Sequence, residues 1–416
     1  DFICIGEGED TILKFAEYIL GNCSLDKIDG LAYIINGKAI YNNPRKPIKD
    51  LDSIPFPAYH HFPVEHYAGT NNPNFNRLFW KIFTSRGCPF RCIYCVSRKV
   101  FDNRWRVRSV KNIFDEISLL VKRYGVTHIA IQDDEPLINK KHILELCDLL
   151  IESKFDVKIS CRCRIDDVKT EVLIKMKQAG FYFLAFGTES GDDDTLEKIN
   201  KHYRYHDIFA GLKAISEAGY PRISVSVLCG FPWETPKHFN NNLRFIKSIP
   251  STIEFYVGPV IVIPYPGTLI YEQYHRQYGF TEWWLKKPEF EHLTIPDNVF
   301  FKYWMPGVNL IDNYNKNFWH YSKKTRRYIN WMALRIEVLS LKSRYSGFSL
   351  VILLLMNLLS LFLYRRWPRL EYLIFSRLTR PATINKLKQI LKCKTKYSEI
   401  INPFYGKANN TSNRSN

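Results

Sequence analysis

Ser85-Arg86-Gly87-Cys88-Pro89-Phe90-Arg91-Cys92-Ile93-Tyr94-Cys95 is the stretch of this 416-residue sequence around which the rest can be arranged. Its three cysteines have the spacing C-x3-C-x2-C and follow directly after an apolar run that ends near Thr84. Three thiolates on one short loop can hold three corners of a cubane iron–sulfur cluster, whereas such clusters usually take four cysteines. The missing fourth ligand would leave one iron open to another molecule.

Two other interpretations of this cysteine loop, residues 85–95, have to be weighed. A structural zinc site normally closes four ligands around the metal, in two paired halves such as C-x2-C, and no second half is evident nearby. A chance group of core cysteines is disfavoured by the flanking Gly, Pro and Arg residues. The sequence therefore favours an iron–sulfur site over both.

Apolar strands and helical stretches alternate from about residue 78 to about residue 270. The predicted strands are Trp80–Thr84, His128–Gln132, Lys158–Cys163, Phe181–Gly187, Ile223–Leu228 and Phe255–Ile263. The predicted helices include Ser109–Tyr124, Lys141–Ser153, Val168–Ala179, Asp192–Ile199 and Tyr205–Ala218. Such repetition specifies a parallel sheet with helices outside it. We therefore predict an α/β fold, a partial (β/α)6 TIM-like barrel with its site at the carboxyl ends of the strands.

The cysteine loop resembles the signature of the radical S-adenosylmethionine superfamily, in which this spacing carries an aromatic residue just before the last cysteine. Tyr94 fills that position. The resemblance implies that Cys88, Cys92 and Cys95 ligate a 4Fe-4S cluster and that Tyr94 lies against the adenine of S-adenosylmethionine. It also implies that the amino and carboxylate groups of this cosubstrate chelate the open iron. An electron from the cluster would then cleave it to a 5′-deoxyadenosyl radical.

Segments after the second and third predicted strands extend the resemblance. Gln132-Asp133-Asp134-Glu135 stands where the family, often with Gly-Gly-Glu, binds the cosubstrate amine, which assigns this role to Asp133 and Asp134. Arg164 stands where the cobalamin-associated branch has an arginine for the cosubstrate carboxylate, a pairing that suits a guanidinium. The residues themselves leave an alternative open for each segment. The acidic residues could form an ordinary loop that caps a helix, and Arg164 could form a surface salt bridge.

Two later turns also match motifs of the family. Residues 186–191, FGTESG, resemble the Gly-x-Glu-Ser-Gly element, which implies that Glu189 contacts the cosubstrate. Residues 230–235, GFPWET, resemble a Gly-Leu-Pro-Gly-Glu-Thr turn that would add Glu234 to the cofactor site. Trp233 replaces the glycine of that turn, so the position of Glu234 is expected to differ from the family pattern.

The N-terminal residues have the pattern of a strand, a Gly-rich turn and a helix, which is half of a βα unit. Gly6-Glu7-Gly8-Glu9 resembles the last turn of the cobalamin-binding domain that precedes the radical domain in one large branch. The resemblance assigns Gly6 and Gly8 to cofactor binding and makes cobalamin an expected cofactor. We interpret residues 1–28 as the truncated C-terminal remnant of this Rossmann-like domain, with its other residues upstream.

The remaining chain divides by composition. We predict a β-ribbon and linker at 29–75, the radical S-adenosylmethionine core at 76–285 and a basic, mainly helical region at 286–416.

From residue 321 onward, 19 Lys and Arg residues against three Glu give +16 of the formal net charge of +18. Such a tail suits anionic lipid or nucleic acid, and a merely solvated basic surface is an equally good interpretation. We expect no specific nucleic-acid partner.

Residues 348–364, FSLVILLLMNLLSLFLY, form a nearly unbroken apolar stretch of 17 residues within this tail. At about 1.5 Å per residue a helix of this length spans roughly 25 Å, slightly less than a bilayer core of about 30 Å. Membrane contact and a buried core or oligomer helix are equally good interpretations.

The ten cysteines are scattered apart from the loop, which indicates a reducing compartment and metal chemistry instead of disulfides. We therefore expect a cytoplasmic protein, with membrane association through 348–364 left open. Cys161 and Cys163 lie on one predicted strand, and we expect them to point to opposite faces of the sheet and not to ligate a metal together.

Taken together, these patterns predict a radical S-adenosylmethionine enzyme, linked to cobalamin, that methylates or otherwise modifies a C–H bond. Its substrate would be a small molecule or a lipid, and its expected partner is an external reductant of the flavodoxin or ferredoxin type. The alternative is a non-enzymatic iron–sulfur protein for electron transfer or sensing, which would carry a fully ligated cluster.

Overall fold

The computed structural model describes residues 2–62, 78–262 and 264–278, together with 335–336, 338–344, 351 and 355. Most of the predicted basic tail and of the apolar stretch 348–364 therefore lies outside the described residues. Within the described part of the chain, no helix combines the length and the hydrophobicity needed to cross a bilayer.

Six parallel strands form the central sheet, in the order β11-β10-β9-β8-β7-β4. The strands are β4 (Leu78–Ile82), β7 (Val126–Ile131), β8 (Lys158–Cys163), β9 (Phe181–Glu189), β10 (Arg222–Cys229) and β11 (Glu254–Ile261). Each neighbouring pair is parallel, which requires a crossover connection between the strands. The predicted partial (β/α)6 barrel is confirmed.

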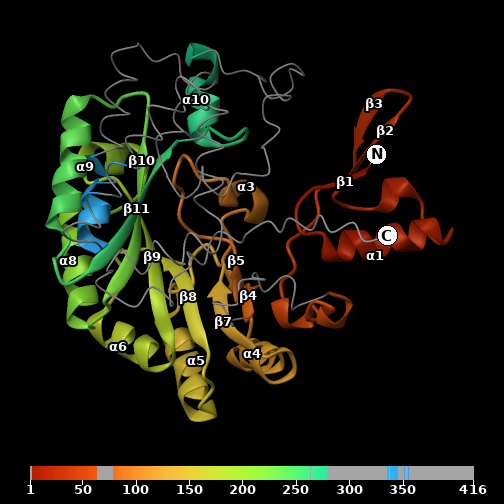
Figure 1. The fold of residues 1–416 in the computed structure, drawn as a ribbon. Helices are drawn as coiled ribbons and strands as arrows, with labels where there is room; N and C mark the ends of the chain where they lie inside the picture. The colour runs from red at the N-terminus through yellow and green to blue at the C-terminus, as the bar shows by residue number, and fades with distance from the viewer. Residues whose placement is uncertain are drawn as a thin grey trace, which may run out of the picture.

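Helices supply these crossovers and cover the outer side of the curved sheet (Figure 1). They are α4 (Val110–Tyr124), α5 (Lys140–Ser153), α6 (Thr170–Gln178), α7 (Asp193–Lys198), α8 (Tyr205–Glu217) and α9 (Pro236–Ser248), and α10 (Leu269–Tyr278) follows the last strand. Helix α4 illustrates how sequence sets their bounds. The Ser109 side chain accepts a hydrogen bond from the backbone N–H of Asn112 at its start, and Gly125 adopts a φ of 64° at its end.

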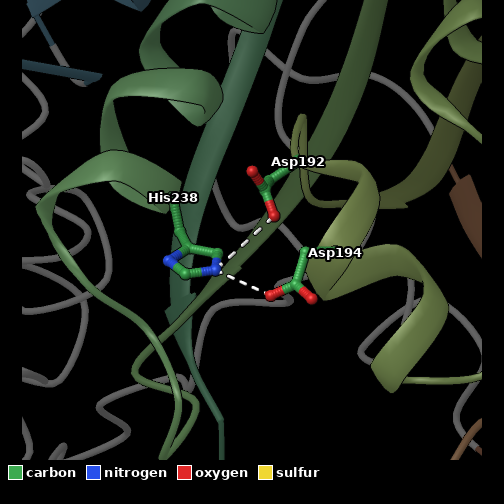
Figure 2. A group of neighbouring side chains, drawn as sticks. All are labelled: Asp192, Asp194 and His238. Carbon is green, nitrogen blue, oxygen red and sulfur yellow. Dashed lines mark hydrogen bonds and ion pairs between the residues drawn. The ribbon is translucent and has the colours of Figure 1, made fainter.

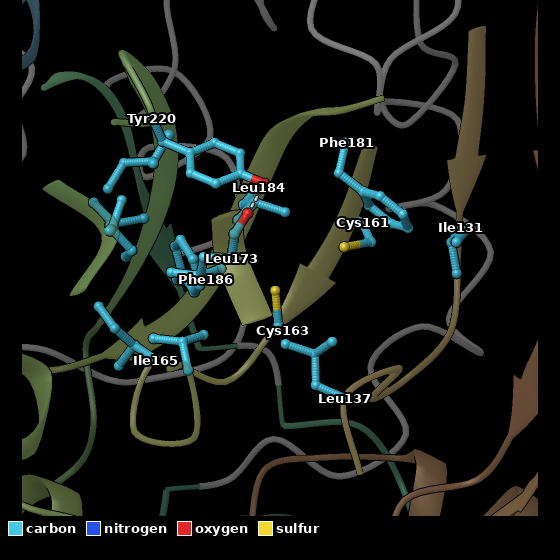
Figure 3. Packing of buried hydrophobic residues seen from close by; sticks show 14 of the residues in the cluster. Ile131, Leu137, Cys161, Cys163, Ile165, Leu173, Phe181, Leu184, Phe186 and Tyr220 are labelled. Atoms are coloured by element: carbon cyan, nitrogen blue, oxygen red, sulfur yellow. Dashed lines mark hydrogen bonds between the residues drawn. The ribbon is translucent and has the colours of Figure 1, made fainter. Parts of the chain in front are cut away.

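The main hydrophobic core lies between this sheet and the helices, and Figure 3 shows part of it. Cys161 and Cys163 both belong to this core, with 0% and 4% of their surface exposed. The expectation that they face opposite sides is wrong, because side chains alternate along a strand and residues two apart share a face. Their surroundings are the apolar residues of the core, such as Leu184 and Phe186.

A smaller antiparallel sheet precedes the barrel and is drawn in red in Figure 1. It consists of β1 (Phe2–Cys4), β2 (Leu31–Ile35) and β3 (Lys38–Tyr41), with α1 (Glu9–Ile19) after β1. Asn36 and Gly37 both have positive φ, as a two-residue hairpin turn requires. Because β1 pairs with β2, the predicted segments 1–28 and 29–75 share one sheet.

Short elements lie within this unit, between it and the barrel, and around the cysteine loop. They are the 3-10 helices η1 (Leu25–Lys27), η2 (Leu51–Ser53) and η3 (Tyr59–His61), the helix α3 (Ser97–Phe101) and the two-residue strands β5 (Ser85–Arg86) and β6 (Arg106–Val107). Strands β5 and β6 pair antiparallel. The cysteine loop thus begins in a small ribbon and ends in a short helix.

Replacement of Gly211 by alanine tests how closely α8 packs on the loop after β8. An added Cβ would lie 2.1 Å from the carbonyl oxygen of Ile165, so the usual helix-stabilising effect of Gly→Ala should be reversed. We expect the free energy of unfolding to fall by about 1–3 kcal/mol, measured by urea denaturation. Lys213→Ala, at an exposed position of the same helix, should change it by no more than about 0.5 kcal/mol. A stabilised Gly211→Ala variant would contradict this packing.

Candidate functional site

The cysteine loop leaves the carboxyl end of β4 and is anchored at its base by Asp133, which follows β7. The carboxylate of Asp133 accepts hydrogen bonds from the backbone N–H of Thr84 at 2.7 Å and from the hydroxyl groups of Thr84 and Ser85. Asp133 is 2% exposed, and burial raises its pKa despite these bonds. In this structure the carboxylate is therefore engaged in holding the loop.

The far side of the loop is fixed by segments from two other parts of the barrel. The backbone N–H of Ile93 donates to the carbonyl of Ile199 after α7, and the carbonyl of Ile93 accepts from the N–H of Ile270 in α10. The Asn200 side chain donates to the carbonyl of Arg91 at 2.9 Å. Hydrogen bonds from several parts of the barrel thus hold the loop on both sides.

The three cysteines of the loop are free thiols, with Cys92 buried and Cys88 and Cys95 partly exposed. Cysteine thiolates are the usual protein ligands of an iron–sulfur cluster, so the chemistry of these three side chains fits such a group. Burial raises the pKa of Cys88 to about 11 and also raises the pKa of Cys95. A metal binds the deprotonated thiolates, so loading these thiols would release protons.

Glu189 and Lys201 form a buried ion pair beside the loop. The Lys201 Nζ lies 3.2 Å from the Glu189 carboxylate and 3.4 Å from the Tyr94 hydroxyl, and only 5% and 8% of Lys201 and Glu189 are exposed. Burial works against the charged form of Lys201, but Tyr94, Tyr203 and Glu189 together raise its pKa. Lys201 therefore remains an ammonium group.

The backbone at Glu189 is held in an unusual conformation. Its φ of 61° is in the left-handed region, at the end of β9 where the pairing with β10 shifts register. The Ser226 hydroxyl donates to the Glu189 carboxylate at 2.9 Å. A Cβ at Gly187 would lie 2.7 Å from this carboxylate, which explains the glycine of the predicted motif. Strain of this kind is typical of functional positions.

Arg164, which we assigned to the cosubstrate carboxylate, makes a bidentate ion pair with Asp166, at 3.0 Å for both bonds. Its guanidinium also donates to the carbonyl of Lys201 at 2.7 Å and lies 3.8 Å from the centre of the Phe90 ring. Arg164 thereby connects the cysteine loop to the segment that carries Lys201. Its assigned role stays a prediction.

The three acidic residues that follow β7, Asp133, Asp134 and Glu135, have different environments. Asp134 is exposed and accepts from the Ser97 hydroxyl at 2.6 Å at the start of α3. Glu135 is 4% exposed, and burial raises its pKa to about 7, an effect that the charges of Arg164 and Lys201 reduce. Our sequence analysis missed Glu135 and Lys201 as site residues. Nothing in the sequence separates Lys201 from exposed lysines nearby, whereas Glu135 stood within the acidic segment already singled out.

Glu234 closes its own turn in the structure. Its carboxylate accepts hydrogen bonds from the backbone N–H groups of Gly230 and Phe231, and Phe231 in turn contacts the Tyr94 ring with 6.4 Å between ring centres. The Trp233 ring stacks on Phe231 at 4.9 Å. Glu234 thus acts on the site through the aromatic residues that pack against Tyr94.

Gly6 and Gly8, the other predicted cofactor residues, lie in the turn between β1 and α1, in the smaller sheet unit. Gly6 has a φ of 93°, which explains the glycine there, and Gly8 is the residue before the first turn of α1. They lie on either side of Glu7 in this turn. Their role in binding cobalamin stays a prediction.

Asp192, Asp194 and His238 form another group with metal-ligand chemistry, shown in Figure 2. The backbone N–H of Thr235 donates to His238 Nδ1 at 3.0 Å, so the proton of the neutral ring is on Nε2. Nε2 lies 2.9 Å from Asp194 and can donate to it. Asp192 caps α7 by accepting from the N–H of Thr195. The group therefore uses its ligand atoms in internal hydrogen bonds.

Comparison with known proteins agrees with this geometry. Residues 82–246 match the profile of the Radical SAM superfamily. An uncharacterized methyltransferase of Pyrococcus horikoshii is 31% identical over 272 residues, which are 65% of this chain and 57% of that protein. The anaerobic magnesium-protoporphyrin IX monomethyl ester cyclase of Rubrivivax gelatinosus is 31% identical over 48% of this chain and 36% of its own length. The chain therefore spans about half of these relatives or less.

Solved structures share the fold at low sequence identity. The tryptophan-bound radical S-adenosylmethionine methyltransferase TsrM from Kitasatospora setae has a TM-score of 0.55 and 19% identity, over 67% of this chain and 54% of that one. The cobalamin-dependent S-adenosylmethionine radical enzyme OxsB has a TM-score of 0.53 and 20% identity, over 65% and 38%.

Glu234 should make stability depend on pH. Burial raises its pKa to about 8, and its Oε1 is buried without a hydrogen-bond partner among the described residues. The folded state therefore binds the proton more tightly than the unfolded state, so stability should fall as pH rises from about 5 to about 8. Urea denaturation across this range should show a smaller fall for Glu234→Gln than for the unchanged protein.

Glu197→Gln, at an exposed position of α7, is the control and should leave the pH profile unchanged. Parallel profiles for Glu234→Gln and the unchanged protein would contradict the role of burial at this carboxyl group.

Proposed function

This chain belongs to the radical SAM superfamily, and from that premise we propose that it is an enzyme that cleaves S-adenosylmethionine reductively at a 4Fe-4S cluster held by Cys88, Cys92 and Cys95. The observation that carries the proposal is the arrangement of these three thiols on one hydrogen-bonded loop at the carboxyl ends of the strands. Three protein ligands leave one iron of such a cluster for the cosubstrate. When bound, the cluster supplies the electron that releases a 5′-deoxyadenosyl radical.

The residues around the loop support this assignment through their charge. Lys201 is a buried ammonium group whose ion-pair partner, Glu189, is on a neighbouring strand end. We propose that Lys201 orients the carboxylate of the cosubstrate and that Glu189 faces its positively charged amine. The Tyr94 ring, which packs on Phe231, would provide the apolar surface for the adenine. Asp133, Asp134 and Arg164 then act by holding the loop and Lys201 in place.

For the overall reaction we propose cobalamin-linked methylation of carbon, or a related C–H modification, of a small molecule or lipid. Two relatives are named methyltransferases, among them cytidylyl-2-hydroxyethylphosphonate methyltransferase of Streptomyces wedmorensis, 28% identical over 48% of this chain and 42% of its own length. The match to a cyclase supports the wider class of C–H chemistry. A low-potential external reductant would supply the electron.

Replacement of Cys92 by alanine should abolish both cluster binding and the cleavage of S-adenosylmethionine. Anaerobically reconstituted protein should bind about one 4Fe-4S cluster and form 5′-deoxyadenosine under a strong reductant, and the variant should do neither, because two thiolates cannot hold the cluster firmly. Iron and sulfide content and product chromatography measure both. Cys147→Ala, which removes a buried thiol of α5, should retain both properties. Product formation by Cys92→Ala would sink the assignment.

Lys201→Met should separate cosubstrate binding from cluster assembly. We expect the KM for S-adenosylmethionine to rise about tenfold or more, as loss of a hydrogen bond from a charged group implies, while the iron content stays near one cluster. Lys201→Arg should recover most of the affinity because it keeps the charge. Lys198→Met, an exposed neighbour on α7, is the matched control. An unchanged KM in Lys201→Met would rule out the proposed contact.

A further inference from the structure

Two arginines face each other in the ribbon from which the cysteine loop begins. Arg86 of β5 and Arg106 of β6 are directly opposite partners in the antiparallel register. Like charges at opposite positions of a strand pair destabilise it, and a ribbon with two residues in each strand has little other pairing to offset this effect. The ribbon therefore needs a counter-ion.

Glu7, in the turn between β1 and α1, is that counter-ion. One carboxylate oxygen of Glu7 lies 3.1 Å from Arg86 Nη1 and 2.9 Å from Arg106 Nη2, and the other lies 2.9 Å from Arg106 Nη1. Only 4% of the Glu7 side chain is exposed. Although burial raises the pKa of Glu7, the hydrogen bonds from Arg106, Ile48 and Arg86 lower it overall, so the carboxylate stays ionised at neutral pH.

Neighbouring residues complete the arrangement. The backbone N–H of Ile48, in the linker, donates to Glu7 at 2.6 Å, and Glu9 makes a second ion pair with Arg86. Three segments far apart in the sequence thus meet at one buried carboxylate: the Gly-rich turn, the linker and the ribbon. Glu7 and Glu9 of the turn therefore have a structural role, which is separate from the cofactor role predicted for Gly6 and Gly8.

The ribbon determines how the chain enters the first cysteine. Gly87, between Arg86 and Cys88, has a φ of 84°, and a Cβ there would lie 2.2 Å from the carbonyl oxygen of Arg104. The backbone next to the ribbon is therefore closely packed immediately before Cys88, where Gly87 meets Arg104. A ribbon that opens by repulsion between Arg86 and Arg106 would move Cys88 away from the other two thiols.

We infer that Glu7 is a positioning residue for the iron–sulfur loop, acting as the buried counter-ion that lets β5 and β6 pair and so directs Cys88. The inference rests on the proposed function, because it assigns to the Gly-rich turn a part in the geometry of the cluster and its cosubstrate. Glu7 acts through Arg86 and Arg106.

The test compares Glu7→Gln with a charge-compensated variant, Glu7→Gln with Arg106→Gln, in the anaerobically reconstituted full chain. Glu7→Gln leaves two arginines facing each other with less negative charge between them. We expect the KM for S-adenosylmethionine, per cluster, to rise about tenfold, as loss of a charge-assisted contact implies. The paramagnetic resonance signal of the reduced cluster should also respond less to added cosubstrate.

The double variant removes the repulsion between the arginines together with the counter-ion. Its KM should therefore return to within about threefold of that of the unchanged protein, a smaller change than the loss of one hydrogen bond usually causes. Glu17→Gln, which breaks an exposed ion pair on α1, is the control and should change neither quantity. Recovery in the double variant separates positioning from a simple loss of folded protein, which a second substitution would not repair.

The outcomes distinguish this inference from the proposed function. If the unchanged protein cleaves S-adenosylmethionine and Glu7→Gln does so with the same KM and the same spectrum, only the positioning role is overturned. If Glu7→Gln is impaired and the double variant is equally or more impaired, repulsion between the arginines is not the cause and the inference is also overturned. An unchanged protein that binds no cluster would overturn both.

Discussion

The buried carboxylate of Asp133 sets the point at which the chain leaves β4 and enters the cysteine loop. Its hydrogen bonds to Thr84 and Ser85 satisfy a charged group that would otherwise be costly to bury. All three cysteines come after this point, so the direction of the loop is set by contacts of the polypeptide alone. Supporting contacts of this kind favour precise placement of the ligands.

Other buried charged side chains around the loop form ion pairs. Lys201 is matched by Glu189, Arg164 by Asp166, and the arginines of the small ribbon by Glu7. Removing one partner of a buried pair usually costs about 3–5 kcal/mol, because the other charge stays behind unpaired. These pairs therefore connect the turn before α1 and the ends of the strands to the segments around the loop.

Sequence reasoning located most elements because their signals are local. The periodicity of apolar residues predicted the strands and helices to within a few residues, and β8 was predicted with its observed bounds, Lys158–Cys163. The acidic segment after β7 was also recognised, yet the sequence could not say that Asp133 holds the loop while Glu135 is buried beside Cys88. That difference depends on burial and on which groups approach from other strands, neither of which a local pattern contains.

The sequence by itself determined the cysteine spacing, the α/β repetition and the glycines that need positive φ, because each of these depends on residues close together in the chain. Only the tertiary structure decided which charges meet. Glu7 and Arg106 are 99 residues apart, and Lys201 resembles any other lysine until the fold removes it from water beside Glu189. Electrostatic and hydrogen-bonding partners are chosen by distance in space and by burial, and both exist only after the chain has folded.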